Sequence, residues 1–330
     1  MNILIVGASG QLGFTICQKL IDSGTGHSVF ASHRKSSNTS ALKELSGLHT
    51  RFLDLTDATT FASAIQGIDV IIITANTATP SKKSDSFKDV DEKGVMALID
   101  AVKAARVQQV IYVSALPFEN RDSKVPLSQA KRAVEKHLKN SGLNYTIIQP
   151  TAFMEVYFPF FGSTIPLRGL KVCTVNRPFE FSNKFFAGIK NDIELKNTFN
   201  VIGKGDKKNA YISIDNVADF CISVIDNSKA SKKTLQIGGP EPLTPMDIKN
   251  IFEELYGKPL KVKTTPPFVI KLLSKVFSVS NKAAANIMAM NYAIATADSI
   301  PPNSLKTAEE FGVNLIHPKG FLSQKFNTPE

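Results

Sequence analysis

The sequence predicts an α/β fold, a doubly wound parallel sheet with a smaller C-terminal lobe. Three observations support this prediction. An apolar strand at the start of the chain runs into a glycine-rich turn, strand and helix patterns then alternate over the first 150 residues, and the alternation lapses after Pro150. A chain of 330 residues is long enough for both parts.

The first strand, Ile3 to Val6, is followed by Gly7, Gly10 and Gly13 and by an amphipathic helical pattern. In a dinucleotide site such glycines permit a tight turn, a close approach to the pyrophosphate, and close packing of helix on strand. The helix N-terminus then faces the phosphate charge. An ordinary strand-to-helix turn is the alternative interpretation. The expected cofactor contacts are Gly7, Ser9, Gly10, Gln11, Leu12 and Gly13.

The second strand, His27 to Ser32, ends at His33, Arg34 and Lys35. Sites selective for NAD carry an acidic side chain about 20 residues past the glycines, whereas an Arg accommodates the 2′-phosphate of NADP. Here the acid is missing. A guanidinium can grip a phosphate with two parallel hydrogen bonds, so Arg34 and Lys35 predict NADP(H). Two solvated charges in a loop are the alternative.

Three further strands are expected at Thr50 to Leu53, Asp69 to Thr74 and Gln109 to Ser114. A helix over Val90 to Ala105 precedes the last of them. The ends of the strands supply the next expected cofactor contacts, because ligands bind at the carboxyl edge of such sheets. These contacts are Thr74, Ala75, Asn76 and Ser114.

A later stretch carries the resemblance to a known family. Pro126 to Leu138 forms a helix with Lys131 near its start, and Ser141 to Phe153 contains a strand that ends at Pro150. With the Gly-x-x-Gly-x-x-Gly spacing, this arrangement resembles the atypical short-chain dehydrogenase/reductases. Within them it is similar to NmrA-like and isoflavone-reductase-like proteins and to relatives of divinyl chlorophyllide reductase and of the nucleotide-binding subunit of complex I. The resemblance covers nearly the whole chain, including residues 211–219 and 237–245.

The resemblance implies roles for several residues. Asp54 would lie beside the adenine, with Leu55 next to it; Thr56 or Asp57 would cap the following helix. Lys131 would position the nicotinamide ribose and act as the catalytic residue. The nicotinamide face would be held by Pro150, Thr151, Ala152 and Phe153.

One departure from the family pattern concerns the proton. Better-known members place a Tyr four residues before the Lys, and here that position is Leu127, which cannot do acid–base work. Either Lys131 takes over, or the chain binds the cofactor without turning it over. Glu155 and Tyr157 are further candidates for proton donation, although exposure to solvent is the commoner fate of such residues.

The chain is expected to divide into two parts. Residues 1–150 form the expected NADP(H)-binding Rossmann domain, to which 210–238 return, and residues 151–209 and 239–330 form the substrate lobe. This lobe is rich in Phe, which indicates either ordinary core or an aromatic substrate pocket: Phe153, Phe158, Phe160, Phe161, Phe179, Phe181, Phe185 and Phe186.

Local signals in this part predict helix starts and a basic amphipathic helix. Asp215 is expected to cap one helix, so that its pairing with Asp219 needs no metal, and Thr244 is expected to cap another. The stretch from Phe268 to Phe277 alternates apolar residues with lysines. We expect it to pack on its own domain rather than lie on an anionic membrane.

Composition excludes several classes of protein. The net charge is +10, but the lysines are scattered and the chain has no Trp, which argues against nucleic-acid binding. The three cysteines lie far apart, so neither a disulfide framework nor a metal site is expected. No signal peptide and no transmembrane segment are recognisable. We therefore expect a soluble, cytoplasmic protein.

The sequence thus predicts an NADPH-dependent oxidoreductase that transfers a hydride to a carbonyl or activated C=C bond of a small apolar molecule, such as a quinone-like or conjugated carbonyl compound. The alternative is a non-catalytic NADP(H)-binding redox sensor or assembly factor that acts through a protein partner. The absence of the Tyr weakens a third interpretation, an epimerase or dehydratase acting on nucleotide sugars.

Overall fold

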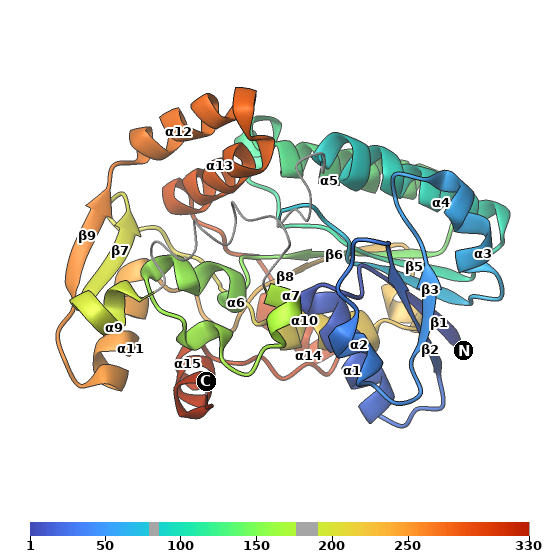
Figure 1. Cartoon of the computed structure of the whole chain (residues 1–330), viewed down its shortest axis with the longest axis horizontal. Coiled ribbons are helices and arrows are strands. Elements are labelled where there is room, and N and C mark those ends of the chain that lie inside the picture. Colours follow the sequence, from blue (N-terminus) through green and yellow to red (C-terminus); the bar gives the residue numbers. More distant parts are fainter. Residues whose placement is uncertain (79–85, 176–190, 330) are drawn as a thin grey trace.

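The computed structural model describes residues 1–78, 86–175 and 191–329. Its centre is a parallel sheet of seven strands in the order β3-β2-β1-β4-β5-β6-β8 (Figure 1). The strands are β1 (Asn2–Val6), β2 (Ser28–His33), β3 (His49–Phe52), β4 (Val70–Ile73), β5 (Gln109–Val113), β6 (Tyr145–Pro150) and β8 (Lys233–Ile237). The predicted doubly wound sheet is therefore confirmed.

All six strand pairings in this sheet are parallel. Their carboxyl ends therefore meet at one edge, where ligands bind in such folds. The order reverses between β1 and β4, since the chain builds outward from β1 first to one side and then to the other. Leu4 and Ile5 of β1 are completely buried, as expected for a strand covered on both faces.

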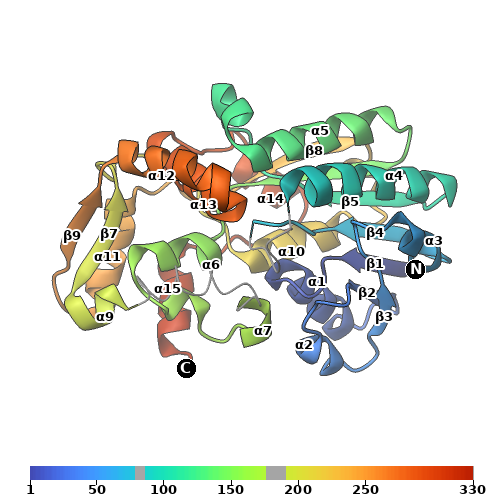
Figure 2. The ribbon, with the colours of Figure 1, turned by 45° about the horizontal axis from the view of Figure 1, so that its top comes forward.

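Helices cover the two faces of the sheet (Figure 2). One face carries α3 (Phe61–Ile65), α4 (Val95–Ala104) and α5 (Pro126–Asn140), and the other carries α1 (Gln11–Asp22), α10 (Ile214–Ser223) and α14 (Ser304–Glu310). Ile3 and Ile5 pack toward α1, whereas Leu4 and Val6 pack toward α4. This alternation follows from the two-residue period of a strand.

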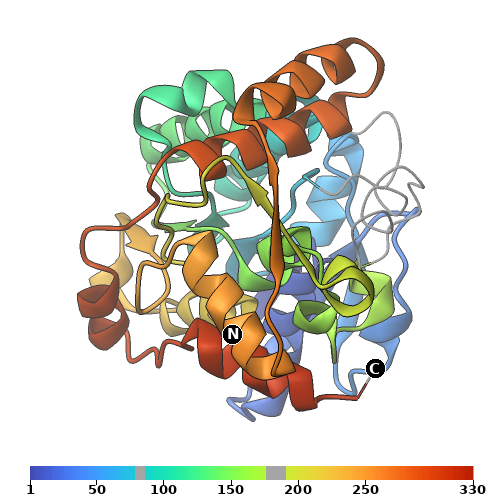
Figure 3. The same ribbon diagram turned by 90° about the vertical axis from the view of Figure 1, so that its left-hand side faces the viewer.

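The distal lobe contains a parallel pair of strands, β7 (Thr198–Ile202) and β9 (Lys261–Thr265) (Figures 1 and 3). Its helices are α6 (Met154–Tyr157), α7 (Val172–Val175), α9 (Asp192–Lys196), α11 (Pro245–Tyr256), α12 (Pro267–Ser280), α13 (Lys282–Thr296) and α15 (Pro318–Asn327). The short helix α2 (Ser40–Lys43) lies beside α1.

The phenylalanines of the distal lobe divide between core and cavity. Phe158 and Phe161 are buried in a core with Phe199 and Tyr211, so the core interpretation holds for them. Phe153 and Phe160 line the cavity described below. Four of the predicted aromatic residues lie outside the described residues: Phe179, Phe181, Phe185 and Phe186.

One of the two helix caps predicted for the second half of the chain differs from the prediction. The N-cap of α10 is Ser213, not Asp215, because the Ser213 hydroxyl accepts the N–H of Asn216. Asp215 and Asp219 instead face Lys19 of α1, with N···O distances of 3.6 and 2.8 Å. The expected cap of α11 is confirmed: Thr244 forms a reciprocal capping box with Asp247.

Candidate functional site

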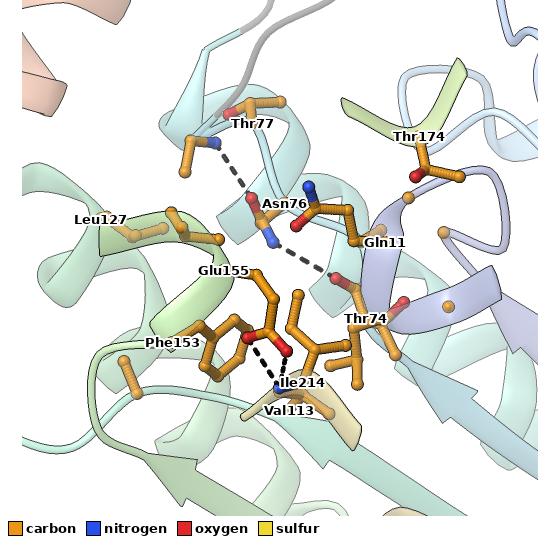
Figure 4. A pocket seen from close by; sticks show the side chains of 18 of the residues that line it. Gln11, Thr74, Asn76, Thr77, Val113, Leu127, Phe153, Glu155, Thr174 and Ile214 are labelled. Atoms are coloured by element: carbon orange, nitrogen blue, oxygen red, sulfur yellow. Dashed lines mark hydrogen bonds between the residues drawn. The ribbon is translucent and has the colours of Figure 1, made fainter. Parts of the chain in front are cut away.

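A cavity of about 620 Å³ opens at the carboxyl edge of the sheet and reaches α13 of the distal lobe (Figure 4). The carboxyl ends of β1 to β6 contribute to its wall. In the close-up, Leu127 and Thr174 lie on opposite sides of it, and Glu155 points into it. The expected cofactor and catalytic residues lie in this wall, with one exception: Gly7, Ser9, Gly10, Gln11, Leu12, Gly13, Arg34, Asp54, Leu55, Thr74, Ala75, Asn76, Ser114, Lys131, Pro150, Thr151, Ala152 and Phe153.

The glycine turn between β1 and α1 has the shape that a pyrophosphate needs. Gly7 has φ +94°, and a Cβ there would lie 2.7 Å from the backbone nitrogen of Ala75. A Cβ at Gly13 would lie 2.4 Å from the carbonyl oxygen of Gly7. Gly10, the N-cap of α1, has no side chain that could accept a hydrogen bond from the first N–H groups of this helix. An anionic group fits at this helix N-terminus.

Arg34 and Lys35 differ in position. Arg34 follows β2 and lines the cavity, and its backbone N–H donates to the Ser37 hydroxyl at 3.2 Å. Lys35 is exposed and does not contribute to the wall. The loop that was predicted to hold two phosphate-binding charges therefore turns one of them toward solvent. Ser32 and Ser37, which the sequence did not suggest, line the cavity beside Arg34.

The ends of β3 and β4 are fixed by local hydrogen bonds. The Asp54 carboxylate accepts the N–H and the hydroxyl of Thr56 at 2.9 and 2.7 Å. Asp57 accepts the N–H of Thr59, which makes Asp57 the cap of the next turn. The Thr74 hydroxyl donates to the carbonyl of Val6 at 3.0 Å. These bonds hold the loops that form the cavity wall in one conformation.

Lys131 is the buried cation of the site, with 3% of its surface exposed. Its Nζ donates to the carbonyl oxygen of Val113 at 2.9 Å and lies 4.8 Å from the centre of the Tyr112 ring. Burial lowers the pKa of its ammonium group, and the carboxylates of Asp91 and Glu135 oppose this shift. A lowered pKa makes this ammonium group a stronger acid than that of an exposed lysine.

A buried polar cluster lies next to Lys131. The Ser114 hydroxyl donates to Glu135 at 2.5 Å, and Gln149 donates to the same carboxylate oxygen at 2.8 Å. Arg132 completes the cluster, with an N···O distance of 3.0 Å to Glu135. The Ser114 side chain is thus engaged within the protein, although the residue also lines the cavity.

Glu155 and Tyr157 both line the cavity and both are buried. The two carboxylate oxygens of Glu155 accept the backbone N–H of Ile214 at 3.0 and 3.1 Å (Figure 4). Burial raises the pKa of this carboxyl to about 7, against the lowering effect of backbone hydrogen bonds. Tyr157 stacks on Tyr211 with ring centres 5.5 Å apart, and burial raises the pKa of its phenol. Neither side chain lies on the surface, the alternative considered from the sequence.

The far end of the cavity is apolar and comes from segments that sequence reasoning missed. Residues of α13 line it, more than 130 positions after Lys131 in the chain. No motif marks this helix, because its contribution depends only on how the distal lobe folds over the sheet. Thr174 and Val175 of α7 also contribute. The missed apolar residues include Pro159, Leu167, Ile287, Met290 and Ile294.

These features define a class of protein. A parallel sheet with a glycine turn at its first strand, a cavity along its carboxyl edge and a buried lysine is the arrangement of a dinucleotide-binding protein. The model of the NAD(P)H-binding family matches residues 7–156. The chain belongs to this family, and residues 7–156 form its NAD(P)H-binding domain.

Comparison with known proteins gives relatives of more than one kind. Photosystem II assembly factor Ycf39 of Trieres chinensis is 26% identical over 84% of this chain and 76% of its own length. An uncharacterized sugar epimerase, YhfK of Bacillus subtilis, is 34% identical over 46% of this chain and 71% of its own length. The NmrA-like family domain-containing oxidoreductase flvB of Aspergillus flavus is 32% identical over 50% of this chain and 52% of its own length.

Among solved structures, the NADPH-dependent quinone oxidoreductase QOR2 of Escherichia coli shares the fold. It aligns with a TM-score of 0.70 at 19% identity and covers 98% of this chain and 100% of its own. At this identity the likeness concerns the fold, including the distal lobe, and not the substrate.

Proposed function

We propose that this protein is an NADPH-dependent reductase that transfers a hydride to a carbonyl or activated C=C bond of a small apolar molecule. The observation that carries this proposal is that one cavity wall includes the glycine turn and Arg34, the buried residues Lys131 and Glu155, and the apolar surface of α13. The wall of this cavity extends beyond the strand ends to apolar residues of α13, where a second small molecule would bind beside the cofactor.

The cofactor contacts follow from the wall of the cavity. Gly10, Gln11 and Leu12 at the start of α1 would hold the pyrophosphate through backbone N–H groups. Arg34 would bind the 2′-phosphate and so select NADPH over NADH. Thr74 to Asn76 and Pro150 to Phe153 would flank the riboses and the nicotinamide. When bound, NADPH supplies the hydride.

Two side chains of the protein share the remaining work. Lys131 would hydrogen-bond the nicotinamide ribose, since its buried Nζ already lies at the cavity wall beside Val113. Glu155 would donate the proton that completes the reduction, because a carboxyl with a pKa of about 7 is partly protonated at neutral pH. Tyr157 is a weaker acid whose pKa is raised further by burial, so we assign it to packing beside the substrate.

A second candidate function is a non-catalytic NADP(H)-dependent assembly factor or redox sensor. The observation in its favour is Leu127, which lines the cavity where related dehydrogenases carry the proton-transferring Tyr. Relatives named photosystem II assembly factors also support a protein partner. The same leucine argues against a sugar epimerase. For either function, we propose that the protein is located in the cytoplasm.

The decisive experiment is an acceptor panel. Purified protein and NADPH are incubated with quinones, enals and ketones, and NADPH consumption is measured. We expect at least one class to be reduced, and Lys131→Met to lose almost all of this turnover. Lys136→Met is the matched control, because Lys136 lies on the same helix but is exposed and outside the cavity.

The two candidate functions give different results. If NADPH binds and no acceptor class is reduced, the reductase proposal is wrong and the binding protein is favoured. If an acceptor is reduced equally well by Lys131→Met, hydride transfer stands, but Lys131 has no part in it.

A further inference from the structure

The helix α12 leaves an apolar face exposed. Phe268, Leu272, Val276 and Val279 keep 69%, 57%, 58% and 91% of their surface accessible. Their spacing places them on one side of the helix, within an arc of about 80°. The opposite side, with Ile270, packs on α13. The expectation that this helix would pack on its own domain is therefore right for one face only.

The stretch of chain that contains this helix carries charge of one sign. From residue 256 to residue 297 the sequence contains six lysines and no aspartate, glutamate or arginine. Two of these lysines, Lys271 and Lys275, are exposed on α12 itself, next to the apolar residues. The other four are Lys258, Lys261, Lys263 and Lys282.

We propose that α12 docks on an anionic lipid surface, with its apolar side chains at the headgroup boundary and its lysines against the headgroups. An exposed apolar stripe flanked by lysines is the pattern of an interfacial helix, and each lysine near an anionic surface adds about 1 kcal/mol of attraction. Protein interfaces concentrate Trp, Tyr and Arg at their centres, and the exposed stripe has none of these. The charge and the composition of the face thus favour lipid over a protein partner.

The orientation follows from the α12–α13 hairpin. The α12 helix lies at the outer edge of the distal lobe with α13 beside it (Figures 1 and 3). The α13 helix lines the apolar end of the cavity with Ile287, Met290 and Ile294. Within the described ranges, none of the helices has both the length and the apolar character for crossing a bilayer. The docked helix lies on the membrane, and, on the proposed function, an apolar substrate dissolved in lipid would be close to the cavity.

Vesicle flotation tests the proposal with the full chain and no substrate. Vesicles of phosphatidylcholine alone are compared with vesicles that also contain phosphatidylglycerol. We expect binding to the anionic vesicles to be at least about tenfold tighter, because several lysines contribute. The pair Leu272→Glu and Val276→Glu is expected to weaken it by about tenfold or more. Leu305→Glu on α14 is the matched control, since Leu305 is an exposed apolar residue with 61% of its surface accessible.

A second variant separates charge from folding. The pair Lys271→Glu and Lys275→Glu should lose anionic-vesicle binding while keeping the wild-type affinity for NADPH, which reports on an intact fold. Equal binding to neutral and anionic vesicles, or no binding to either, would overturn the proposal. The proposal would also be overturned if the protein bound no vesicles and instead formed a concentration-dependent dimer, detected by light scattering, that Leu272→Glu disrupts. None of these outcomes depends on whether the protein reduces a substrate.

Discussion

Arg34 and Lys35 are neighbours in the chain, yet only Arg34 lines the cavity. A guanidinium binds a phosphate through paired, charge-assisted hydrogen bonds, which contribute about 1.5 to 3 kcal/mol. We therefore predict that Arg34→Ala weakens NADPH binding roughly tenfold to a hundredfold and leaves NADH binding nearly unchanged. Titration calorimetry with both nucleotides measures this.

Lys35→Ala is the control for that prediction, because Lys35 is exposed and does not line the cavity. Its effect on NADPH affinity should be less than about threefold. Equal affinities for NADPH and NADH in the wild-type protein would refute selection by Arg34. An equal loss in both variants would assign the 2′-phosphate to the loop as a whole.

Glu155 gives a prediction about the pH dependence of turnover. As proton donor it must be protonated, and its carboxyl has a pKa of about 7. Turnover should therefore be constant below this pH and fall about tenfold per unit above it. Glu155→Gln should turn over much more slowly and lose this dependence, whereas Tyr157→Phe should keep it. A profile of kcat against pH for the three proteins provides the measurement.

Glu155 also links folding stability to pH. Its pKa is raised from 4.5 to about 7 by folding, so the folded state holds the proton more tightly than the unfolded chain. The stabilisation is fully present below pH 4.5 and is lost as the pH rises through 7. Relative to Glu155→Gln, the free energy of unfolding of the wild type should fall by up to about 3 kcal/mol over this pH range. Denaturant unfolding of both proteins at several pH values measures this change. If the difference between their free energies of unfolding did not depend on pH, the raised pKa would be contradicted.

At the scale of the element, the turn between β1 and α1 depends on glycine for packing as well as for binding. A Cβ at Gly13 would meet the Gly7 carbonyl oxygen at 2.4 Å and the Ala8 Cα at 2.8 Å, both of them backbone atoms. Gly13→Ala must therefore move α1 away from β1. We expect it to lower the free energy of unfolding by about 1 to 3 kcal/mol and to weaken NADPH binding.

Gly320→Ala is the matched control for this substitution. Gly320 lies inside α15, where a Cβ would meet nothing within 4 Å. Alanine in a helix is more stable than glycine by about 0.5 to 1 kcal/mol, so this variant should be slightly stabilised and bind NADPH normally. If both variants had the same free energy of unfolding, the close approach of α1 to β1 at Gly13 would make no contribution to stability.

Elements of the sheet were predictable, while their ends were less so. The strands β1, β4 and β5 are nearly continuous apolar runs, and the sequence places the first five strands of the sheet within a few residues. The first helix was expected to follow the three glycines, but α1 begins at Gln11, between the second and the third, since the glycine turn itself supplies its first residues. The helix expected over Val90 to Ala105 begins as a π-helical turn, Phe87–Gly94, before α4.

At the scale of the whole molecule, the half of the site built by the sheet was predictable and the half built by the distal lobe was not. Motif residues follow strands, and parallel strands end at one edge, so their meeting follows from topology. The residues of α13 and α7 reach the cavity only through tertiary packing, which no local pattern encodes. The division into residues 1–150 with 210–238 and the remainder stays a prediction.

The central claim is that NADPH and an apolar acceptor bind together in one cavity, which both lobes form. The most direct test uses NADPH deuterated at C4 of the nicotinamide, with the acceptors of the panel, and mass spectrometry of the products. We predict one deuterium on the reduced carbonyl or C=C carbon of at least one acceptor, lost in Lys131→Met and kept in Lys136→Met. For a quinone acceptor the label can exchange from oxygen, so enals and ketones are the informative acceptors. Tight NADPH binding with no deuterated product from any of them would contradict the claim.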